Sequence, residues 1–251
     1  MTEKSNREFP FIIRPENVSR YEDGEVFILD RRVYPFDVKF VHCKTYEDTA
    51  KAIEDMVTQS GGPGIAAGQG MIQAARQASH LSAEGIAEAL DIGAKRLART
   101  RPTHNQIRVV TTQMLNAGLD ALSKGLDVEK VLLSFMENEV ARRHKVAMLR
   151  GKAGASVLKD GDCIMNHCWA ESGIIYTLYA ALEAGMNLTA FCSETRPYLQ
   201  GARLTADAIA EMGIPTTVVT DNMPGFIISK GMASVFMSGA DRVSMSGHVF
   251  N

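Results

Sequence analysis

Four polar residues follow short apolar runs in the second half of the sequence. Cys168 comes after CIMNH, Glu194 after NLTAFCS, Asp221 after TTVVT, and Asp241 soon after SVFMSG. Their spacings of 26, 27 and 20 residues each fit about one βα unit. Ligands of open α/β sheets bind at the carboxyl ends of the strands. We therefore expect these groups to meet at one edge of a parallel sheet, where a thiol and a carboxyl group could exchange protons with a substrate.

The residues beside the thiol are NHCWAESG, and a helix is expected to follow them. The N-terminus of that helix would favour a thiolate or bind an anion. His167 would point to the other face of the strand, so we interpret it as a hydrogen-bonded structural residue. Trp169 fits either a pocket wall or the core. For Asp221, capping of the next helix remains an equal alternative.

The other cysteines do not suggest a metal site or a disulfide framework. Cys43, Cys163 and Cys192 form no C-x-x-C pair with each other or with Cys168. A disulfide framework is not typical of a chain of 251 residues. We expect Cys192 to be buried in a strand and Cys43 to be structural.

The composition excludes some classes of partner. The chain is 45% apolar and 22% charged, with a formal net charge of −2, so neither nucleic acid nor an anionic membrane is an expected partner. No apolar run reaches the roughly 18 residues of a membrane span, and the N-terminus lacks the apolar region of a secretory signal. The expected location is the cytoplasm.

The elements that must position these groups fall into two parts, and the predicted fold class is α/β. Residues 1–130 are expected to form a mostly helical domain with a short β region, and residues 131–150 a connecting helix. Residues 151–251 alternate apolar runs with helical stretches, which predicts a Rossmann-like parallel sheet with helices on both faces. Helices are expected over 83–99, 104–122, 128–149, 171–185, 201–213 and 223–231. The basic run 142–145 is interpreted as a solvated helix face.

Two strings in the second half resemble a known family. They are ETRPYLQGARLTADAIAEMGIPTTVVTDNM and GADRV. They are similar to the family of methylthioribose-1-phosphate isomerases, ribose-1,5-bisphosphate isomerases and the regulatory subunits of translation initiation factor 2B. Weaker similarity at 60–70 and 99–105 extends the resemblance over most of the chain. The resemblance implies a homodimer that acts on a small-molecule sugar phosphate and needs no metal or organic cofactor.

The resemblance also implies roles for individual residues. The isomerases pair the cysteine of an N-H-C motif with the aspartate of G-A-D-R, which here are Cys168 and Asp241. Regulatory subunits usually lack this pair, so its presence favours an enzyme. The other implied site residues would bind substrate: Arg101 of R-P-T and the loop at Ser60, Gly61 and Gly62 for phosphate, with Trp169, Gln200, Asp221 and Asn251 around the sugar.

Several departures from the family pattern concern the substrate more than the chemistry. The loop arginine of the family is Ser60 here, the residue after the cysteine is Trp169, and a family glycine is Glu171. In addition, the family's G-D-V is Gly247-His248-Val249. A 5-deoxyribose-1-phosphate isomerase is therefore as good an expectation as a methylthioribose-1-phosphate isomerase. The family also continues beyond Asn251, so we expect an incomplete sheet that missing residues or a partner would cover.

Three functions remain open from the sequence. The first is an aldose–ketose isomerase in which Asp241 protonates the ring oxygen while Cys168 moves the proton at C2, or only assists a hydride shift. The second is a non-catalytic sugar-phosphate or nucleotide-binding protein of the regulatory type. The third is a thiol hydrolase, which is weakly supported because no histidine is placed as a base and no nucleophile elbow surrounds Cys168.

Overall fold

The computed structural model describes residues 8–240 and 242–250. These residues form two compact units, one of residues 15–143 and one that joins the residues before Pro15 to those from His144 onward. The predicted connecting segment 131–150 lies within one helix, α6 (Val128–Ala155), and the division between the units falls inside that helix. No described helix is both long and apolar enough to cross a membrane.

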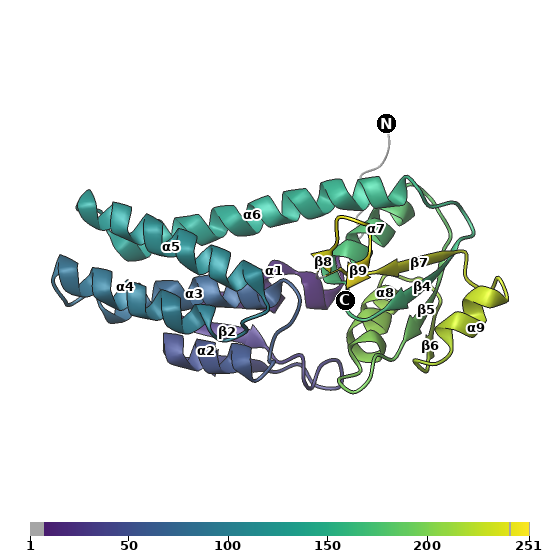
Figure 1. The fold of residues 1–251 in the computed structure, drawn as a ribbon, viewed down its shortest axis with the longest axis horizontal. Helices are drawn as coiled ribbons and strands as arrows, with labels where there is room; N and C mark the ends of the chain where they lie inside the picture. Colours follow the sequence, from purple (N-terminus) through teal and green to yellow (C-terminus); the bar gives the residue numbers. More distant parts are fainter. Residues whose placement is uncertain (1–7, 241, 251) are drawn as a thin grey trace. The chain divides into compact units, whose positions relative to one another are not determined.

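The unit of residues 15–143 combines a small antiparallel sheet with a helical layer (Figure 1). The sheet has the order β1-β2-β3, formed by Ser19–Glu22, Glu25–Leu29 and Phe40–Cys43. The helices are α1 (Pro15–Val18), α2 (Tyr46–Glu54), α3 (Gly62–Gln77), α4 (Ala83–Ala98), α5 (Asn105–Ser123) and the first part of α6. This sheet is the short β region expected in the first part of the chain, and its apolar side chains share one core with α2 to α6.

Small residues let α3 occupy the centre of this core. A Cβ atom at Gly68 would lie 2.2 Å from Sδ of Met136, and one at Gly70 would lie 3.0 Å from a methyl carbon of Leu97. Larger residues would force α3 away from its neighbours, because protein interiors are close-packed. The glycine and alanine residues of this helix therefore allow its close packing.

The second unit contains the predicted parallel sheet, in the order β6-β5-β4-β7. The strands are β4 (Cys163–His167), β5 (Thr189–Ser193), β6 (Thr216–Val219) and β7 (Val235–Ser238). Three helices connect them: α7 (Glu171–Glu183), α8 (Ala206–Glu211) and α9 (Pro224–Ser229). Right-handed crossovers place α7 and α8 on one face and α9 on the other, as Figure 1 shows. The predicted fold class is confirmed.

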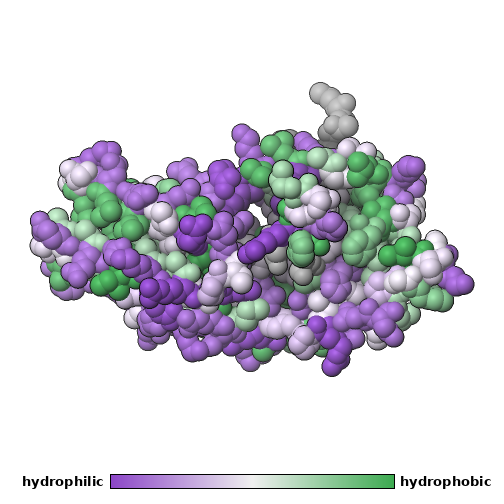
Figure 2. Space-filling model, viewed as in Figure 1, coloured by the Kyte–Doolittle hydropathy of each residue, from purple (hydrophilic) through white to green (hydrophobic). Residues whose placement is uncertain are grey.

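The remaining elements of this unit are short. A 3₁₀ turn (η1) covers Phe11–Ile13, and a two-stranded antiparallel sheet joins β8 (Arg242–Val243) to β9 (Val249–Phe250). β7 is an edge of the four-stranded sheet. Exposed apolar side chains lie on β6, α9 and β7: Val218, Phe226, Ile228 and Phe236. Figure 2 shows apolar surface among polar surface at its right-hand end.

Two helices differ from their predicted bounds. α6 continues six residues past the expected end at 149, because Gly151 and Gly154 serve packing and do not end the helix. Their missing Cβ atoms would lie 2.4 Å from the carbonyl oxygen of Tyr176 and from Oγ1 of Thr177, both in α7. The helix expected over 201–213 begins as a π-helical turn, η2 (Gly201–Thr205), and continues as α8.

Helix α2 begins with a capping box. The Thr45 hydroxyl accepts the backbone N–H of Asp48 at 3.1 Å, and the Asp48 carboxylate accepts the backbone N–H of Thr45 at 2.9 Å. We expect Thr45→Ala to lower the free energy of unfolding by about 1 kcal/mol, because N-cap threonines contribute about that much. Urea denaturation, monitored by circular dichroism, would measure the change in the free energy of unfolding.

The matched control for this prediction is Thr112→Ala. Thr112 is exposed inside α5, where its hydroxyl bonds only to the carbonyl of Arg108 in its own helix. Removal of that hydroxyl should change the free energy of unfolding by less than about 0.5 kcal/mol. A loss in Thr45→Ala no larger than that in the control would contradict the role of the cap.

Candidate functional site

Cys168 follows β4 directly, at the point where the sheet's connections change direction. Because β4 leads through α7 to β5 on one side and neighbours β7 on the other, its carboxyl end is a topological switch point, where ligands of such sheets bind. His167 and Ser238 face each other in register at the ends of β4 and β7. Asp241 and Asn251 lie outside the described residues, so their predicted roles stay predictions. β7 ends at Ser238, three residues before Asp241 in the sequence.

One segment, residues 195–205, binds every polar group of Cys168. The backbone N–H of Cys168 donates a hydrogen bond to Oγ1 of Thr195 at 3.0 Å. The carbonyl oxygen of Cys168 accepts a hydrogen bond from the Thr205 hydroxyl at 2.6 Å. Nε2 of Gln200 donates to the sulfur at 3.3 Å. The sequence predicted Cys168 and Gln200 in one site, and the structure places them in contact. The sequence did not reveal that Thr195 and Thr205 would bind the backbone of Cys168, although both belong to the ETRPYLQGARLT string.

The backbone around this thiol is held in unfavourable conformations. φ is +67° at Cys168, +59° at Thr195 and +62° at Leu199, all in the left-handed region. Such conformations cost of order 1–3 kcal/mol each and tend to occur at functional sites. The hydrogen bonds above maintain them at the ends of β4 and β5.

Gly201 allows the segment to approach β5. A Cβ atom there would lie 1.9 Å from the carbonyl oxygen of Ser193 and 2.6 Å from Oγ1 of Thr195. No side chain fits at this position without moving the backbone. The π-helical turn that starts at Gly201 is itself a feature found frequently at functional sites.

Two of the four cysteines lie in surroundings that keep the thiol inert. Cys43 and Cys192 are fully buried, and burial raises the pKa of their thiols to about 11 and about 12. Both remain protonated near neutral pH, as expected for structural residues. Nδ1 of His167 lies 2.7 Å from Oγ of Ser193, so this histidine is hydrogen-bonded as expected, and its structural role stays a prediction.

The first turn of α7 does not offer an open anion site near the thiol. Glu171 is the first residue of that helix and only 7% exposed, so its own carboxyl group lies at the positive end of the helix dipole. This corrects the expectation that the helix end would bind an anion. Trp169 is buried, with 5% of its surface exposed.

Asp221 does not cap the helix after β6. Its two carboxylate oxygens accept the backbone N–H groups of Thr195 and Arg196, each at 2.7 Å. Burial acts to raise the pKa of this carboxyl, but the two N–H donors outweigh it and hold the pKa below its ordinary value. Asp221 thus fixes the turn after β5 that carries Thr195, and its predicted contact with substrate stays a prediction.

The other predicted site residues lie in the unit of residues 15–143. Ser60 is exposed and has a φ of +56°, Gly61 is the N-cap of α3, and Gly62 is its first residue. The turn at Arg101 reaches this loop through His104, whose Nε2 lies 2.9 Å from the carbonyl oxygen of Ser60. The structure therefore brings the two predicted phosphate-binding segments of this unit together.

Buried polar atoms without a hydrogen-bond partner among the described residues occur beside both groups of residues. In one unit they include Oε1 of Gln200 and Oδ1 of Asn166. In the other they include Oγ1 of Thr58, Nε2 of Gln59 and Nδ1 of His104. Because native proteins leave few buried polar groups unsatisfied, such atoms call for a ligand or water.

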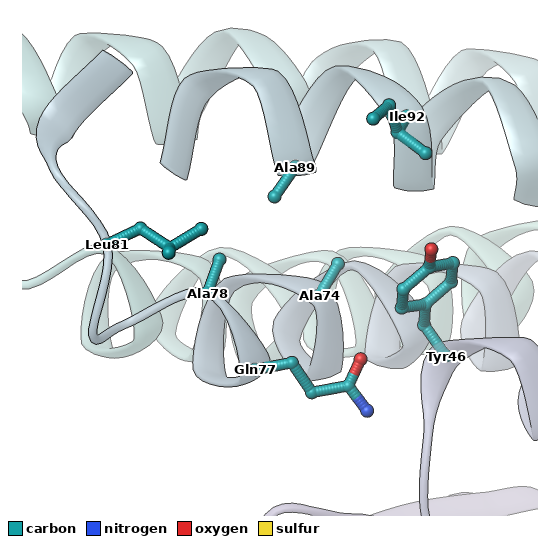
Figure 3. Close-up of a pocket in the computed structure, with 7 residues that line it drawn as sticks. All are labelled: Tyr46, Ala74, Gln77, Ala78, Leu81, Ala89 and Ile92. Atoms are coloured by element: carbon teal, nitrogen blue, oxygen red, sulfur yellow. The ribbon is translucent and has the colours of Figure 1, made fainter. Parts of the chain in front are cut away.

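A shallow cavity of about 200 Å³ lies elsewhere in the helical unit (Figure 3). It lies between α3 and α4, with Tyr46 of α2 beside it, and its lining is mainly apolar: Tyr46, Ala74, Gln77, Ala78, Leu81, Ala89 and Ile92. Ala74 is 12 residues from Gly62, or about 18 Å along α3. The cavity therefore does not coincide with the predicted phosphate loop.

Comparison with known proteins identifies the family. Residues 57–251 match the model of the initiation factor 2 subunit family. The chain belongs to this family. It is 37% identical over 90% of its length to a methylthioribose-1-phosphate isomerase from Thermosipho melanesiensis, and 34% identical over 89% to one from Thermotoga maritima. It spans 68% and 66% of those two proteins. The resemblance stated from the sequence is confirmed.

Solved structures share the fold. The 5-methylthioribose 1-phosphate isomerase of Pyrococcus horikoshii superposes with a TM-score of 0.82 at 24% identity, over 98% of this chain and 71% of that one. Subunit delta of the translation initiation factor eIF-2B from A. fulgidus superposes with a TM-score of 0.78 at 28% identity, over 90% of this chain and 68% of that one. The fold is thus common to proteins with an isomerase name and to initiation-factor subunits.

The contact between Gly201 and β5 gives a first test of the site. We expect Gly201→Ala to lower the free energy of unfolding by roughly 1–3 kcal/mol, because the added Cβ would overlap a backbone carbonyl. Trp169, the single tryptophan, lies next to Cys168 and reports on this unit during urea denaturation. Gly225→Ala is the control, since nothing lies within 4 Å of its Cβ position. Equal stability of the two variants would show that the close approach is not required.

The Asp221 hydrogen bonds predict a dependence on pH. Because its folded-state pKa is depressed, its contribution to stability is present above its unfolded-state pKa of about 3.9 and is lost as pH falls through the folded-state value. Asp221→Asn should therefore be less stable than wild type at pH 7, and the difference should shrink below about pH 4. Urea midpoints measured by Trp169 fluorescence across this range would show it. A difference independent of pH would rule out the carboxylate as its source.

Proposed function

We propose that the chain is an aldose–ketose isomerase that converts a 5-substituted or 5-deoxy (thio)ribose 1-phosphate to the corresponding ribulose 1-phosphate. The observation that carries the proposal is the position of Cys168 at the switch point of the sheet, with Gln200 bound to its sulfur. The isomerase names of relatives at 37% and 34% identity support it. Asp241 in the G-A-D-R motif supplies the second group that the reaction needs.

The substrate sets the chemical problem. Its C1 carries phosphate, so the ring cannot open to a free aldehyde. Instead the bond between C1 and the ring oxygen must break while the hydrogen on C2 leaves. An acid at the ring oxygen and a base at C2 make this possible, provided that their proton affinities differ.

In the proposed reaction, Cys168 as thiolate removes the proton from C2, and the electron pair forms a C1–C2 double bond. The bond from C1 to the ring oxygen breaks, and Asp241 donates its proton to that oxygen. The resulting cis-enediol phosphate returns to a carbonyl when Cys168 delivers a proton to C1 and the Asp241 carboxylate takes the hydroxyl proton at C2. The product is the ketose 1-phosphate, and both groups regain their starting states.

The remaining site residues are proposed to bind substrate. Arg101 and the loop at Ser60, Gly61 and Gly62 would bind phosphate through guanidinium and amide donors. Oε1 of Gln200 would accept a sugar hydroxyl, because this buried oxygen has no partner among the described residues. Further contacts with the sugar are proposed for three residues: Trp169, Asp221 and Asn251.

The partner in this proposal is a small-molecule sugar phosphate, and assembly is as a homodimer in the cytoplasm. The 5-deoxy substrate rests on the departures at Trp169 and Glu171. Both follow the thiol within three residues, and both are buried, with 5% and 7% of their surfaces exposed. Bulky side chains there would change the room near the sugar more than the proton transfer.

A second candidate is a non-catalytic binding protein of the initiation-factor type. The superposition on subunit delta of eIF-2B from A. fulgidus, at 28% identity, supports this alternative. Such a protein would bind a sugar phosphate or nucleotide without turnover. The presence of both Cys168 and Asp241 favours the isomerase.

Phosphorus NMR can test the function directly. The purified protein would be incubated with 5-methylthioribose 1-phosphate, 5-deoxyribose 1-phosphate or ribose 1,5-bisphosphate. We expect a ketose phosphate signal from one of the first two. Cys168→Ser and Asp241→Asn should each lower turnover by at least about 10³-fold, as expected for removal of a required acid or base, while binding of the sugar phosphate remains within a few-fold.

The outcomes separate the candidates. Turnover near wild type in either variant would remove that residue from the mechanism. Binding of a sugar phosphate without product from any of the three would favour the binding protein. His167→Asn serves as the control, because its ring contacts Ser193 and not the thiol, and it should retain most of the turnover.

A further inference from the structure

Arg143 occupies an unusual position in the helical unit. It lies near the middle of α6, in the basic run that the sequence suggested to be a solvated helix face, yet its side chain is only 22% exposed. Nη1 donates to the carbonyl oxygen of Gly61 at 3.3 Å. The guanidinium also lies against Gly64, with Nη2 3.1 Å from the position of a Cβ there. It thus contacts the first turn of α3.

A cation is not expected at this end of a helix. The helix dipole places partial positive charge at the N-terminus, where the first amides have no intrahelical partner. The first turn of α3 carries no acidic residue. An arginine against this turn adds positive charge to positive charge, which favours the arrival of an anion.

The nearby acidic residue neutralises only part of this charge. The Glu139 carboxylate accepts a hydrogen bond from Nε of Arg143 at 2.8 Å and another from Nε of Arg142 at 2.7 Å. The Arg142 donors lower the pKa of this carboxyl, burial opposes them, and Arg143 adds to the lowering, so that Glu139 stays ionised. One carboxylate between two guanidinium groups leaves a net charge of +1 beside α3.

Unsatisfied buried side chains supply an independent sign of a ligand. Thr58 is fully buried, and its Oγ1 lies 1.9 Å from the position of a Cβ at Gly62, directly against the start of α3. Neither this hydroxyl nor Nε2 of the buried Gln59 has a hydrogen-bond partner among the described residues. A phosphate oxygen is the kind of acceptor that such donors and the amides of the first turn recognise.

We infer that Arg143 binds the substrate's phosphate at the N-terminus of α3, and that it supplies the guanidinium which the adjacent loop, with Ser60, does not carry. This inference rests on the proposed function for the identity of the ligand. The phosphate binding itself involves residues of one unit, namely the 58–64 loop and Arg143 together with the proposed contact of Arg101, and does not require turnover. A phosphate monoester is the chemical class that the site would take.

The test compares Arg143→Gln with Arg142→Gln. The two arginines are neighbours in α6 and share Glu139. The side chain of Arg142, however, is 63% exposed, and among the described residues it hydrogen-bonds to Glu139 alone. Binding of 5-deoxyribose 1-phosphate and of inorganic phosphate would be measured by calorimetry. We expect Arg143→Gln to weaken both by about tenfold or more, and Arg142→Gln by less than about twofold.

Two further variants keep the test informative if Arg143→Gln is poorly folded. Arg143→Lys retains the charge and should bind phosphate with intermediate affinity. The double variant Ser60→Arg with Arg143→Gln returns a guanidinium to the loop and should recover part of the lost affinity. Circular dichroism and thermal unfolding would verify that all variants are folded before binding is compared.

Turnover separates this inference from the proposed function. If the chain isomerises a sugar phosphate, Arg143→Gln should raise KM with little change in kcat, because a phosphate held equally in ground and transition states affects binding only. Phosphate binding that depends on Arg143, without any turnover, would support the inference and contradict the proposed isomerase function. Equal phosphate affinity in Arg143→Gln and Arg142→Gln would overturn the inference whatever the turnover.

Discussion

The candidate site depends on the hydrogen bonds that hold the backbone of Cys168 in a left-handed conformation. A cysteine rarely adopts such a φ, and without compensation the backbone would relax and turn the thiol away. Thr195 accepts its N–H, and Thr205 donates to its carbonyl oxygen. Because both partners come from the chain that follows β5, the position of the sulfur at the end of β4 is determined by the neighbouring connection.

That connection in turn depends on β6. Asp221 binds two successive backbone amides of the turn after β5, and Gly201 allows the π-helical turn to lie against Ser193. The carboxyl ends of three parallel strands are thus linked in sequence: β6 orders the turn after β5, and that turn orders Cys168. Several residues of the string at 194–223 that resembles the known family therefore support the position of the thiol.

Much of the architecture follows from the sequence, since local patterns determine it. Short apolar runs between helical stretches predict β4 to β7, and Thr45 with Asp48 predicts the start of α2. The sequence also predicts which residues follow the strands, because chain order and parallel topology suffice for that. Chain order and topology do not place Cys168 near Gln200, because no spacing rule brings residues 32 apart into contact. Only the family resemblance predicted that they belong to one site.

The missed features are those that depend on packing between distant segments. Gly151 looks like the end of α6, but it serves the close approach of α7. Arg143 looks like part of a solvated basic run, because nothing in its neighbourhood along the chain shows that Gly61 would meet it. Thr195 and Thr205 are ordinary residues by type, and only the tertiary structure shows that they bind the same backbone unit.

The charges around two helix N-termini differ, and the difference bears on where an anion would bind. The first turn of α7 contains the buried Glu171, so a phosphate there would meet a carboxyl group at close range. The first turn of α3 has no acidic residue, has Arg143 beside it, and has the hydroxyl of Thr58 available. Although α7 follows the thiol directly, the charge distribution favours α3 for phosphate.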